Sequence, residues 1–207
     1  MADLRTWLDD VNKLGQLVMI DGVHWNLELS TLTEIINERS KTRPAILFDH
    51  IRDYPQGYRV AANLVSSTER LALTLGMKAG LSDIEFIQAW RRQVKTIAPV
   101  TAETVATGPL FDNAQRGKDI DVLKFPVPRW HELDGGRYIG TDDLVITRDP
   151  EEGWVNVGTY RIMVHGPDRL ALHMSPGKHG RVHKEKYHHQ KIVSGGGLLR
   201  PSPNQLC

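Results

Sequence analysis

The chain has 207 residues, of which 40% are hydrophobic and 25% are charged, and this is the composition of an ordinary globular protein. A formal net charge of +1 argues against a nucleic-acid-binding protein with a broad basic surface, and a single cysteine, Cys207, excludes a disulfide framework or a cysteine-based zinc site. Because no apolar run approaches the roughly 20 residues that span a bilayer, and residues 1–5 do not resemble a secretory signal, we expect no membrane partner and a cytoplasmic location.

The first hundred residues are predicted to alternate helices and strands. Apolar residues at helical spacing predict a helix over residues 4–14, which Gly15 would end. Three capping-box patterns predict the starts of further helices, at Thr31-x-x-Glu34, Ser66-x-x-Glu69 and Ser82-x-x-Glu85. Short apolar runs predict strands over residues 16–20, 45–48 and 59–64. This alternation is typical of a small α/β domain.

The pattern changes after Pro99, with a boundary expected within residues 96–118. Strand-like runs now dominate, at residues 122–127, 143–147, 155–164 and 170–174. Glycine, proline and aspartate separate them, which predicts an antiparallel sheet or barrel. A helix rich in lysine and histidine is expected from about Gly177 to His189. Residues 191–207 show neither helical nor strand periodicity and are predicted to be a flexible tail.

The first candidate site residues are Asn156 and Arg161, which flank Gly158-Thr159-Tyr160 in a strand-like run. Gly158 would let the backbone approach a ligand closely, and the Arg161 guanidinium could bind a phosphate or carboxylate in bidentate fashion. The alternative is a surface β-bulge with a solvated arginine, and the local sequence alone favours that alternative.

The histidines of the last predicted helix are a second candidate. His179 and His183 are four residues apart, so a helix would place both on one face, as two metal ligands can be. Most of these histidines stand among lysines and glutamates, which favours a solvated helix face, and His183 is included in that interpretation. His179 differs because it follows Pro176-Gly177-Lys178 at a strand-to-helix junction, where helix N-termini bind anions. Trp154 could shape a pocket or lie in the core.

Taken together, these motifs resemble the UbiD family of reversible decarboxylases over roughly residues 1–189. The resemblance rests on a set of motifs in order: Pro126-Val127-Pro128, Asp134-Gly135-Gly136-x-Tyr138-Ile139-x-Thr141, Asn156-x-Gly158-x-Tyr160-Arg161 and Pro176-x-x-His179. The later motifs are most similar to members that act on hydroxylated aromatic acids, such as protocatechuate, gallate or 4-hydroxybenzoate.

The resemblance implies a role for each candidate residue. Asn156 and His179 would be ligands of a Mn²⁺ ion that also holds the phosphate of prenylated FMN, and the Trp154 carbonyl would bind K⁺. The cofactor would be lined by Thr141, Gly158, Thr159, Tyr160 and Lys178, together with Arg161. Arg161 would also be the catalytic residue that contacts the carboxylate of a small aromatic acid substrate. A flavin prenyltransferase would supply the cofactor.

The resemblance also implies an α+β fold in three parts. These are an N-terminal α/β domain over residues 1–105, a partial split β-barrel of the FMN-binding type over residues 106–190, and a tail over residues 191–207 outside the family pattern. Full-length members would form homo-oligomers. The family continues with a third, glutamate metal ligand and a glutamate pair, and residues 190–207 contain no glutamate. We therefore expect a truncated, inactive or incomplete decarboxylase.

Two other functions remain open at this point. The chain could be a flavin- or nucleotide-binding module without catalysis, or a fragment that another chain completes. It could also be a structural domain whose histidine-rich helix binds metal only adventitiously.

Overall fold

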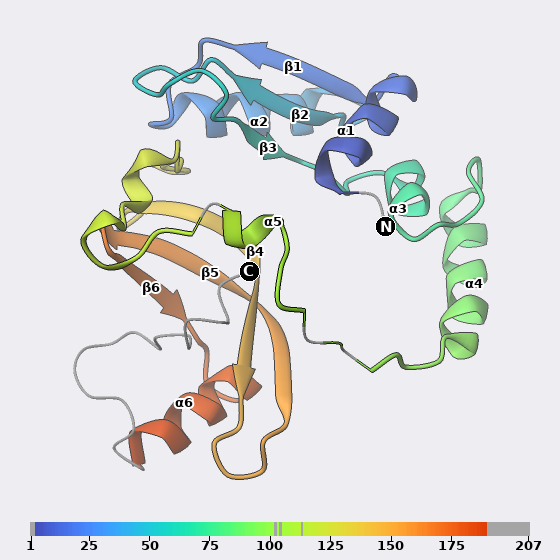
Figure 1. Ribbon diagram of the computed structural model, residues 1–207. Helices are drawn as coiled ribbons and strands as arrows, with labels where there is room; N and C mark the ends of the chain where they lie inside the picture. The colour runs from blue at the N-terminus through green and yellow to red at the C-terminus, as the bar shows by residue number, and fades with distance from the viewer. Residues whose placement is uncertain (1–2, 102, 104, 113, 190–207) are drawn as a thin grey trace. The chain divides into compact units, whose positions relative to one another are not determined.

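A computed structural model describes residues 3–101, 103, 105–112 and 114–189. The chain divides into two compact units, Met1–Thr107 and Gly108–Cys207, and each is described by itself. One unit holds an α/β sheet and the other an antiparallel sheet, which confirms the α+β fold class (Figure 1). The domain boundaries remain predictions, and the tail expected at residues 191–207 lies outside the described residues.

The first unit is built on a three-stranded mixed sheet. Its strands are β1 (Leu17–Asp21), β2 (Ala45–Asp49) and β3 (Val60–Ala62), in that order across the sheet. β1 and β2 are parallel because α2 (Glu28–Arg39) carries the chain back between them, whereas β3 is antiparallel to β2. Residues 45–48 of the central strand are all buried and form the core of the sheet.

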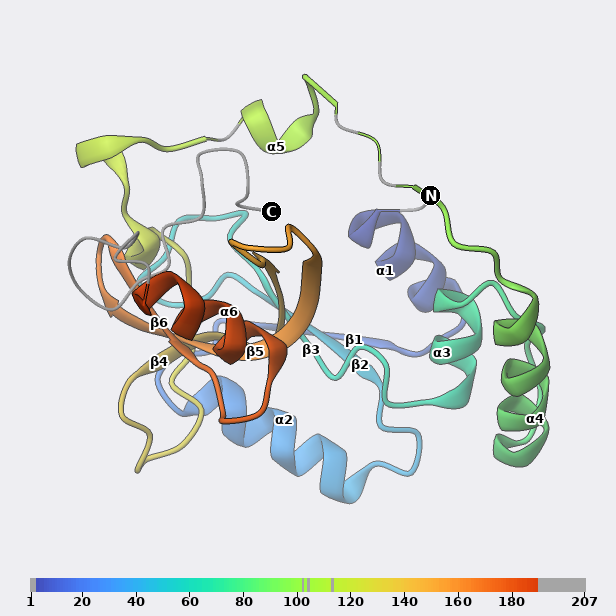
Figure 2. The same ribbon diagram turned by 90° about the horizontal axis from the view of Figure 1, so that it is seen from below.

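The remaining helices of this unit are α1 (Leu4–Lys13), α3 (Thr68–Thr74) and α4 (Asp83–Gln93), followed by the short 3₁₀ helix η1 (Val94–Thr96). Both views show α3 beside α4 (Figure 1, Figure 2). The capping box at Ser82 is confirmed, because its side chain and that of Glu85 bind each other's backbone N–H. The other two caps were predicted wrongly. α2 begins at Glu28 rather than near Thr31, and the α3 cap is Ser67 rather than Ser66.

The second unit begins with short helical turns, α5 (Pro109–Asp112), η2 (Gly117–Asp119) and η3 (Val122–Lys124). The strand predicted over residues 122–127 is therefore wrong. Pro126 and Pro128 have no backbone N–H to donate to a strand ladder, which is the physical reason that this apolar run does not join the sheet. Val127 is nevertheless buried.

An antiparallel sheet follows, with the order β4 (Arg137–Arg148), β5 (Val155–Gly166) and β6 (Arg169–His173). The helix α6 (His179–His189) contacts β4 and β5. The described residues show this three-stranded sheet but no closed barrel, so the split barrel remains a prediction. Within the same residues, no helix is long and apolar enough to cross a membrane.

Candidate functional site

The site is built around two facing residues of the antiparallel sheet. Thr147 of β4 pairs with Asn156 of β5, and the Asn156 Nδ2 donates a hydrogen bond of 3.2 Å to the Thr147 Oγ1. The same hydroxyl lies 2.9 Å from the Nδ1 of His183, which reaches it from α6. The Thr147 hydroxyl therefore links β5 and α6 through hydrogen bonds.

Trp154 joins this contact to the start of α6. Its ring meets the His183 ring edge-on, with centroids 4.1 Å apart, and the His179 ring in the same manner at 5.2 Å. His179 is exposed, whereas His183 is completely buried. The prediction of a solvated face is thus wrong for His183, because its ring fills the space between α6, Thr147 and Trp154. It is correct for His188 and His189, which are exposed.

The buried carboxylate of Asp149 lies next to His183 and completes this group of contacts. The Asp149 side chain is fully buried and accepts hydrogen bonds from the N–H groups of Glu151 and Glu152, at 2.8 and 2.9 Å. Lys186 of α6 donates to the Asp149 Oδ2 at 2.8 Å and lies 3.0 Å from the Glu151 carboxylate. Burial raises the pKa of Asp149, but the hydrogen bonds from Lys186 and the two N–H groups outweigh it and hold the pKa well below its usual range. Asp149 is therefore ionised.

Tyr160 anchors the start of α6 to β5. Its ring is buried, and its hydroxyl accepts a 3.0 Å hydrogen bond from the N–H of Gly180. A Cβ added at Gly158 would lie 2.6 Å from the Tyr160 ring, and one added at Gly180 would lie 2.5 Å from its hydroxyl. Both glycines are thus explained by packing against Tyr160, and one helix N-terminal N–H that an anion could use is already occupied.

Arg161 is not brought together with Asn156. β5 pairs regularly with β4 over residues 155–160 and with β6 over residues 161–164, and exposure alternates along it from residue 155 to residue 161, so these residues, five apart, point to opposite faces. Arg161 is exposed, and Thr159 lies on its face. Opposite Arg161, residues 141–142 form a bulge in β4 between the pairs of Gly140 and Asp143, and bulges often re-aim side chains beside active sites. The Thr141 side chain lies outside the described part.

The structure therefore gathers Trp154, Asn156 and His179 on the α6 side of the sheet. Lys178 is exposed at the turn before α6, where its carbonyl accepts a 3.1 Å hydrogen bond from the N–H of Val182. The Trp154 carbonyl accepts the N–H of Asp149 at 2.8 Å and keeps a second lone pair. Among the described residues, no three His, Cys, Asp or Glu side chains gather as a metal site.

The sequence did not single out Thr147 or Asp149, and it named His183 only as a possible metal ligand beside His179. Spacing gives no direct signal for their contacts between the sheet region and α6, because these join residues 34 to 37 positions apart in the chain. The one available signal was the Asp149-Pro150 turn, whose aspartate commonly accepts the backbone N–H groups that follow it.

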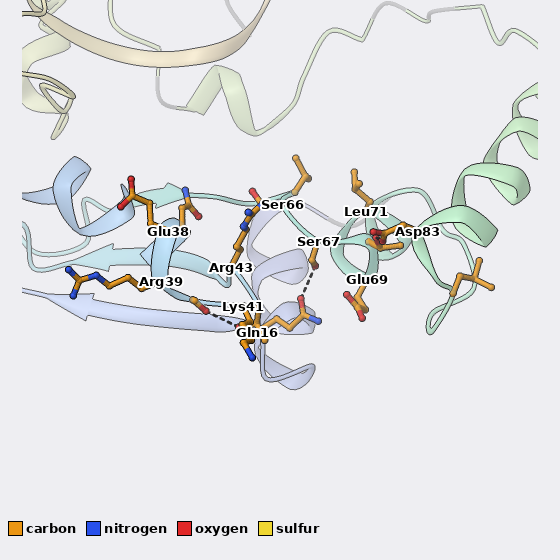
Figure 3. A pocket seen from close by; sticks show the side chains of 16 residues that line it. Gln16, Glu38, Arg39, Lys41, Arg43, Ser66, Ser67, Glu69, Leu71 and Asp83 are labelled. Atoms are coloured by element: carbon orange, nitrogen blue, oxygen red, sulfur yellow. Dashed lines mark hydrogen bonds between the residues drawn. The ribbon is translucent and has the colours of Figure 1, made fainter. Parts of the chain in front are cut away.

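The first unit has a cavity of its own, of about 770 Å³ (Figure 3). It lies between the end of α2 and the start of α3 and has a mainly polar lining, with Arg39, Lys41 and Arg43 opposed by Glu69 and Asp83. None of the residues predicted as a site lines it.

In a comparison with known proteins, each of the two units matches a domain of the same enzyme family. The N-terminal domain of 3-octaprenyl-4-hydroxybenzoate carboxy-lyase matches residues 8–90, and the Rift-related domain of the same enzyme matches residues 103–198. A phenolic acid decarboxylase of Streptomyces sp. (strain D7) is 34% identical over 177 residues, which are 83% of this chain and 37% of that protein.

Solved structures agree with this match. The vanillic acid decarboxylase of Sedimentibacter hydroxybenzoicus in closed form superposes with a TM-score of 0.80 at 29% identity, over 92% of this chain and 40% of that one. A dimeric form of the UbiD-class enzyme HmfF from Pelotomaculum thermopropionicum, in complex with prFMN, gives 0.73 at 25% identity, over 92% and 42%.

The two matched domains and the order of the units correspond to the N-terminal portion of these relatives. The chain belongs to the UbiD family, and the hydroxyarylic acid decarboxylases are among its near relatives. It spans about 40% of the length of the relatives that it matches.

Proposed function

We propose that this chain supplies part of the active site of a UbiD-type enzyme that reversibly decarboxylates an aromatic acid of the hydroxybenzoic type with prenylated FMN. The observation that carries the proposal is the contact of Trp154 with His179 and the link of Asn156 to Trp154 through Thr147 and His183, together with the family match across both units. A relative that binds prFMN supports the choice of cofactor.

Asn156 and His179 would hold a Mn²⁺ ion and, through it, the cofactor phosphate. Their donors fit such an ion, because an amide oxygen and an imidazole nitrogen are both ligands that divalent metals accept. Asn156 commits its Nδ2 to Thr147, which leaves its Oδ1 for a metal. The second lone pair of the Trp154 carbonyl would serve K⁺.

The remaining residues would bind the cofactor and the substrate. Thr141, Gly158, Thr159, Tyr160 and Lys178 would line prenylated FMN, which when bound supplies the electron sink for decarboxylation. The Arg161 guanidinium would hold the substrate carboxylate in bidentate fashion and orient it. The bulge opposite Arg161 would set the direction of its side chain.

The site would be completed by protein beyond the described residues. The sheet face opposite α6 exposes Leu144, Ile146, Val155 and Val157, which are between 40% and 66% exposed. A contiguous apolar face of this kind marks a covered interface. We propose that the portion found in the full-length relatives, on this or another chain, covers it and adds the missing carboxylates, and that the complete protein forms homo-oligomers.

The test is turnover after co-expression with a flavin prenyltransferase. Evolution of CO₂ from protocatechuate, 4-hydroxybenzoate and gallate is measured for this chain alone and for this chain with the remaining portion of a near relative supplied in trans. We expect binding of the cofactor by the chain alone, and CO₂ release only when the second polypeptide is present. Robust turnover by the chain alone would contradict the incomplete-site proposal.

A second candidate is a flavin-binding module without catalysis. It is favoured by the finding that, among the described residues, no three His, Cys, Asp or Glu side chains gather as a metal site. Binding of FMN and Mn²⁺ without turnover, even with the second polypeptide present, would establish this alternative. Absence of any binding would exclude both functions.

A further inference from the structure

A chain of contacts runs from Asp149 through His183 and Thr147 to Asn156. The His183 Nε2 lies 3.7 Å from the Asp149 Oδ2, and both side chains are completely buried. The His183 Nδ1 lies 2.9 Å from the Thr147 Oγ1, which in turn lies 3.2 Å from the Asn156 Nδ2. Apart from the ionised Asp149, each of these groups can have its hydrogens placed in more than one way.

When His183 is neutral, two arrangements of these hydrogens satisfy both hydrogen bonds and also give the Thr147 hydroxyl hydrogen an acceptor. A third, in which Thr147 accepts from both neighbours, leaves that buried hydrogen without an acceptor among the described residues and is therefore disfavoured. In the first, the Asn156 NH₂ donates to the Thr147 hydroxyl, that hydroxyl donates to the His183 Nδ1, and the His183 proton sits on Nε2. In the second, the amide is turned over, the Thr147 hydroxyl donates to the Asn156 Oδ1, and the His183 Nδ1–H donates to Thr147. The orientation of the amide is therefore coupled to the tautomer of His183.

Asp149 distinguishes the two arrangements. In the first, the His183 Nε2–H points its positive end at the buried carboxylate, 3.7 Å away. In the second, the Nε2 lone pair faces the same carboxylate, which is repulsive in a buried, poorly screened site. The Nε2 has no hydrogen-bond partner among the described residues, so this charge is the strongest influence on it.

The surrounding charges favour a neutral His183 beside an ionised Asp149. Lys186 and the N–H groups of Glu151 and Glu152 already bind the carboxylate. The ring is completely buried, and the Lys186 ammonium lies on the same carboxylate, so a second proton on the imidazole would place an additional buried charge there.

We propose that Asp149, His183 and Thr147 are positioning residues that fix the Asn156 amide with its NH₂ toward Thr147 and its oxygen available to a cation. The proposal rests on the function proposed above, in which Asn156 is a metal ligand. A turned amide would present NH₂ to the cation and remove that ligand. The metal affinity of Asn156 is therefore set by a carboxylate three contacts away.

The first test needs neither metal nor a variant. Nitrogen-15 NMR of the imidazole rings of the full chain, recorded without metal, identifies the nitrogen of His183 that carries the proton. We expect a neutral ring with the proton on Nε2. A ring with its proton on Nδ1 would overturn the proposal whether or not the chain binds Mn²⁺.

The second test compares Thr147→Val with Thr147→Ser and measures Mn²⁺ affinity from the paramagnetic resonance of the free ion. Valine has the shape of threonine without the hydroxyl, and we expect a loss of about tenfold or more, the usual effect of removing such a partner. Serine keeps the hydroxyl and should restore wild-type affinity. Equal affinity in wild type and Thr147→Val would overturn the proposal.

Failure of the proposed function has a separate signature. The wild-type chain could bind no Mn²⁺ while His183 carries its proton on Nε2. The metal role of Asn156 would then be wrong, but the result would still support the hydrogen-bond chain that fixes the orientation of the Asn156 amide. The dispersion of amide signals in Thr147→Val, matched to Thr147→Ser, shows that the variant is folded.

Discussion

Packing against Tyr160 explains why two positions are glycine: Gly158 in the family motif and Gly180 at the start of α6. The sequence suggested that Gly158 admits a ligand, and the structure shows that Gly158 and Gly180 both lie against the ring of Tyr160. The motif therefore encodes the packing of α6 on β5 as well as any cofactor contact. A substitution at either glycine should act on stability before it acts on binding.

Gly180→Ala tests this packing. Its Cβ would lie 2.5 Å from the Tyr160 hydroxyl and 2.9 Å from the ring carbon that bears it, so we expect a loss of about 1–3 kcal/mol in the free energy of unfolding in urea. Gly166→Ala is the matched control, since its Cβ would meet only Asp168 at 3.9 Å. An equal effect of the two substitutions would show that Tyr160 does not impose the requirement.

The buried His183 predicts a dependence of stability on pH. Its pKa is lowered by burial, so the unfolded chain takes up a proton more readily than the folded one. The stability that it contributes is complete above the unfolded pKa of 6.5 and is lost as the pH falls from there toward the lower folded pKa. We expect His183→Gln to reduce the loss of unfolding free energy between pH 7 and pH 5, which urea titrations would measure. The exposed His188→Gln should leave that loss unchanged.

At the scale of elements, the described residues of the second unit leave part of one sheet face exposed. α6 contacts β4 and β5 on the side of Asn156, and the other side exposes apolar residues. Such a face favours self-association. We expect the chain to associate as its concentration rises, and Val157→Lys to oppose this in sedimentation experiments, because the lysine would place a charge within the apolar face.

Leu133→Lys is the control for that experiment. Leu133 is 97% exposed but lies in the turn before β4 and is not one of the strand residues that form the apolar face. Its substitution should leave the association unchanged. Association that persists in Val157→Lys but not in Leu133→Lys would assign the contact to another surface.

The sequence predicted most elements but fewer of their contacts. Apolar periodicity located β1, β2 and the three strands of the second unit, because burial of one face is a local pattern. It failed at residues 122–127, where Pro126 and the following Pro128 prevent strand pairing, and at the start of α2, where the chain bends at Leu27 with a positive φ of 67°. The partners of His183 and Asp149 could not be predicted, because they depend on how α6 packs against the sheet.

At the scale of the whole chain, the first unit has its own structural anchor, Arg70. This buried guanidinium donates to the carbonyls of Arg43, Asn63 and Leu64 and to the side chain of Gln16, all within residues 1–107. Three of the four acceptors are backbone groups, so the arginine ties the loop after β3 to the segment before β2.

Arg70→Met should therefore destabilise the first unit. Hydrogen bonds to a charged group each contribute roughly 1.5–3 kcal/mol, so we expect a loss of about 3 kcal/mol or more in its unfolding free energy. NMR signals of the second unit should keep their positions, since Arg70 has no described contact there. A shift of the Tyr160 or His183 signals would show that the two units depend on each other.

The most direct test of the proposed site uses titration calorimetry. It measures the joint binding of Mn²⁺ and FMN, or of Mn²⁺ and prenylated FMN, to the full chain. We predict that Asn156→Leu and His179→Leu each weaken joint binding by at least tenfold, whereas the exposed His188→Leu has no effect. Equal binding by all four proteins, or an equal loss in His188→Leu, would contradict the assignment of Asn156 and His179 as the metal and cofactor site.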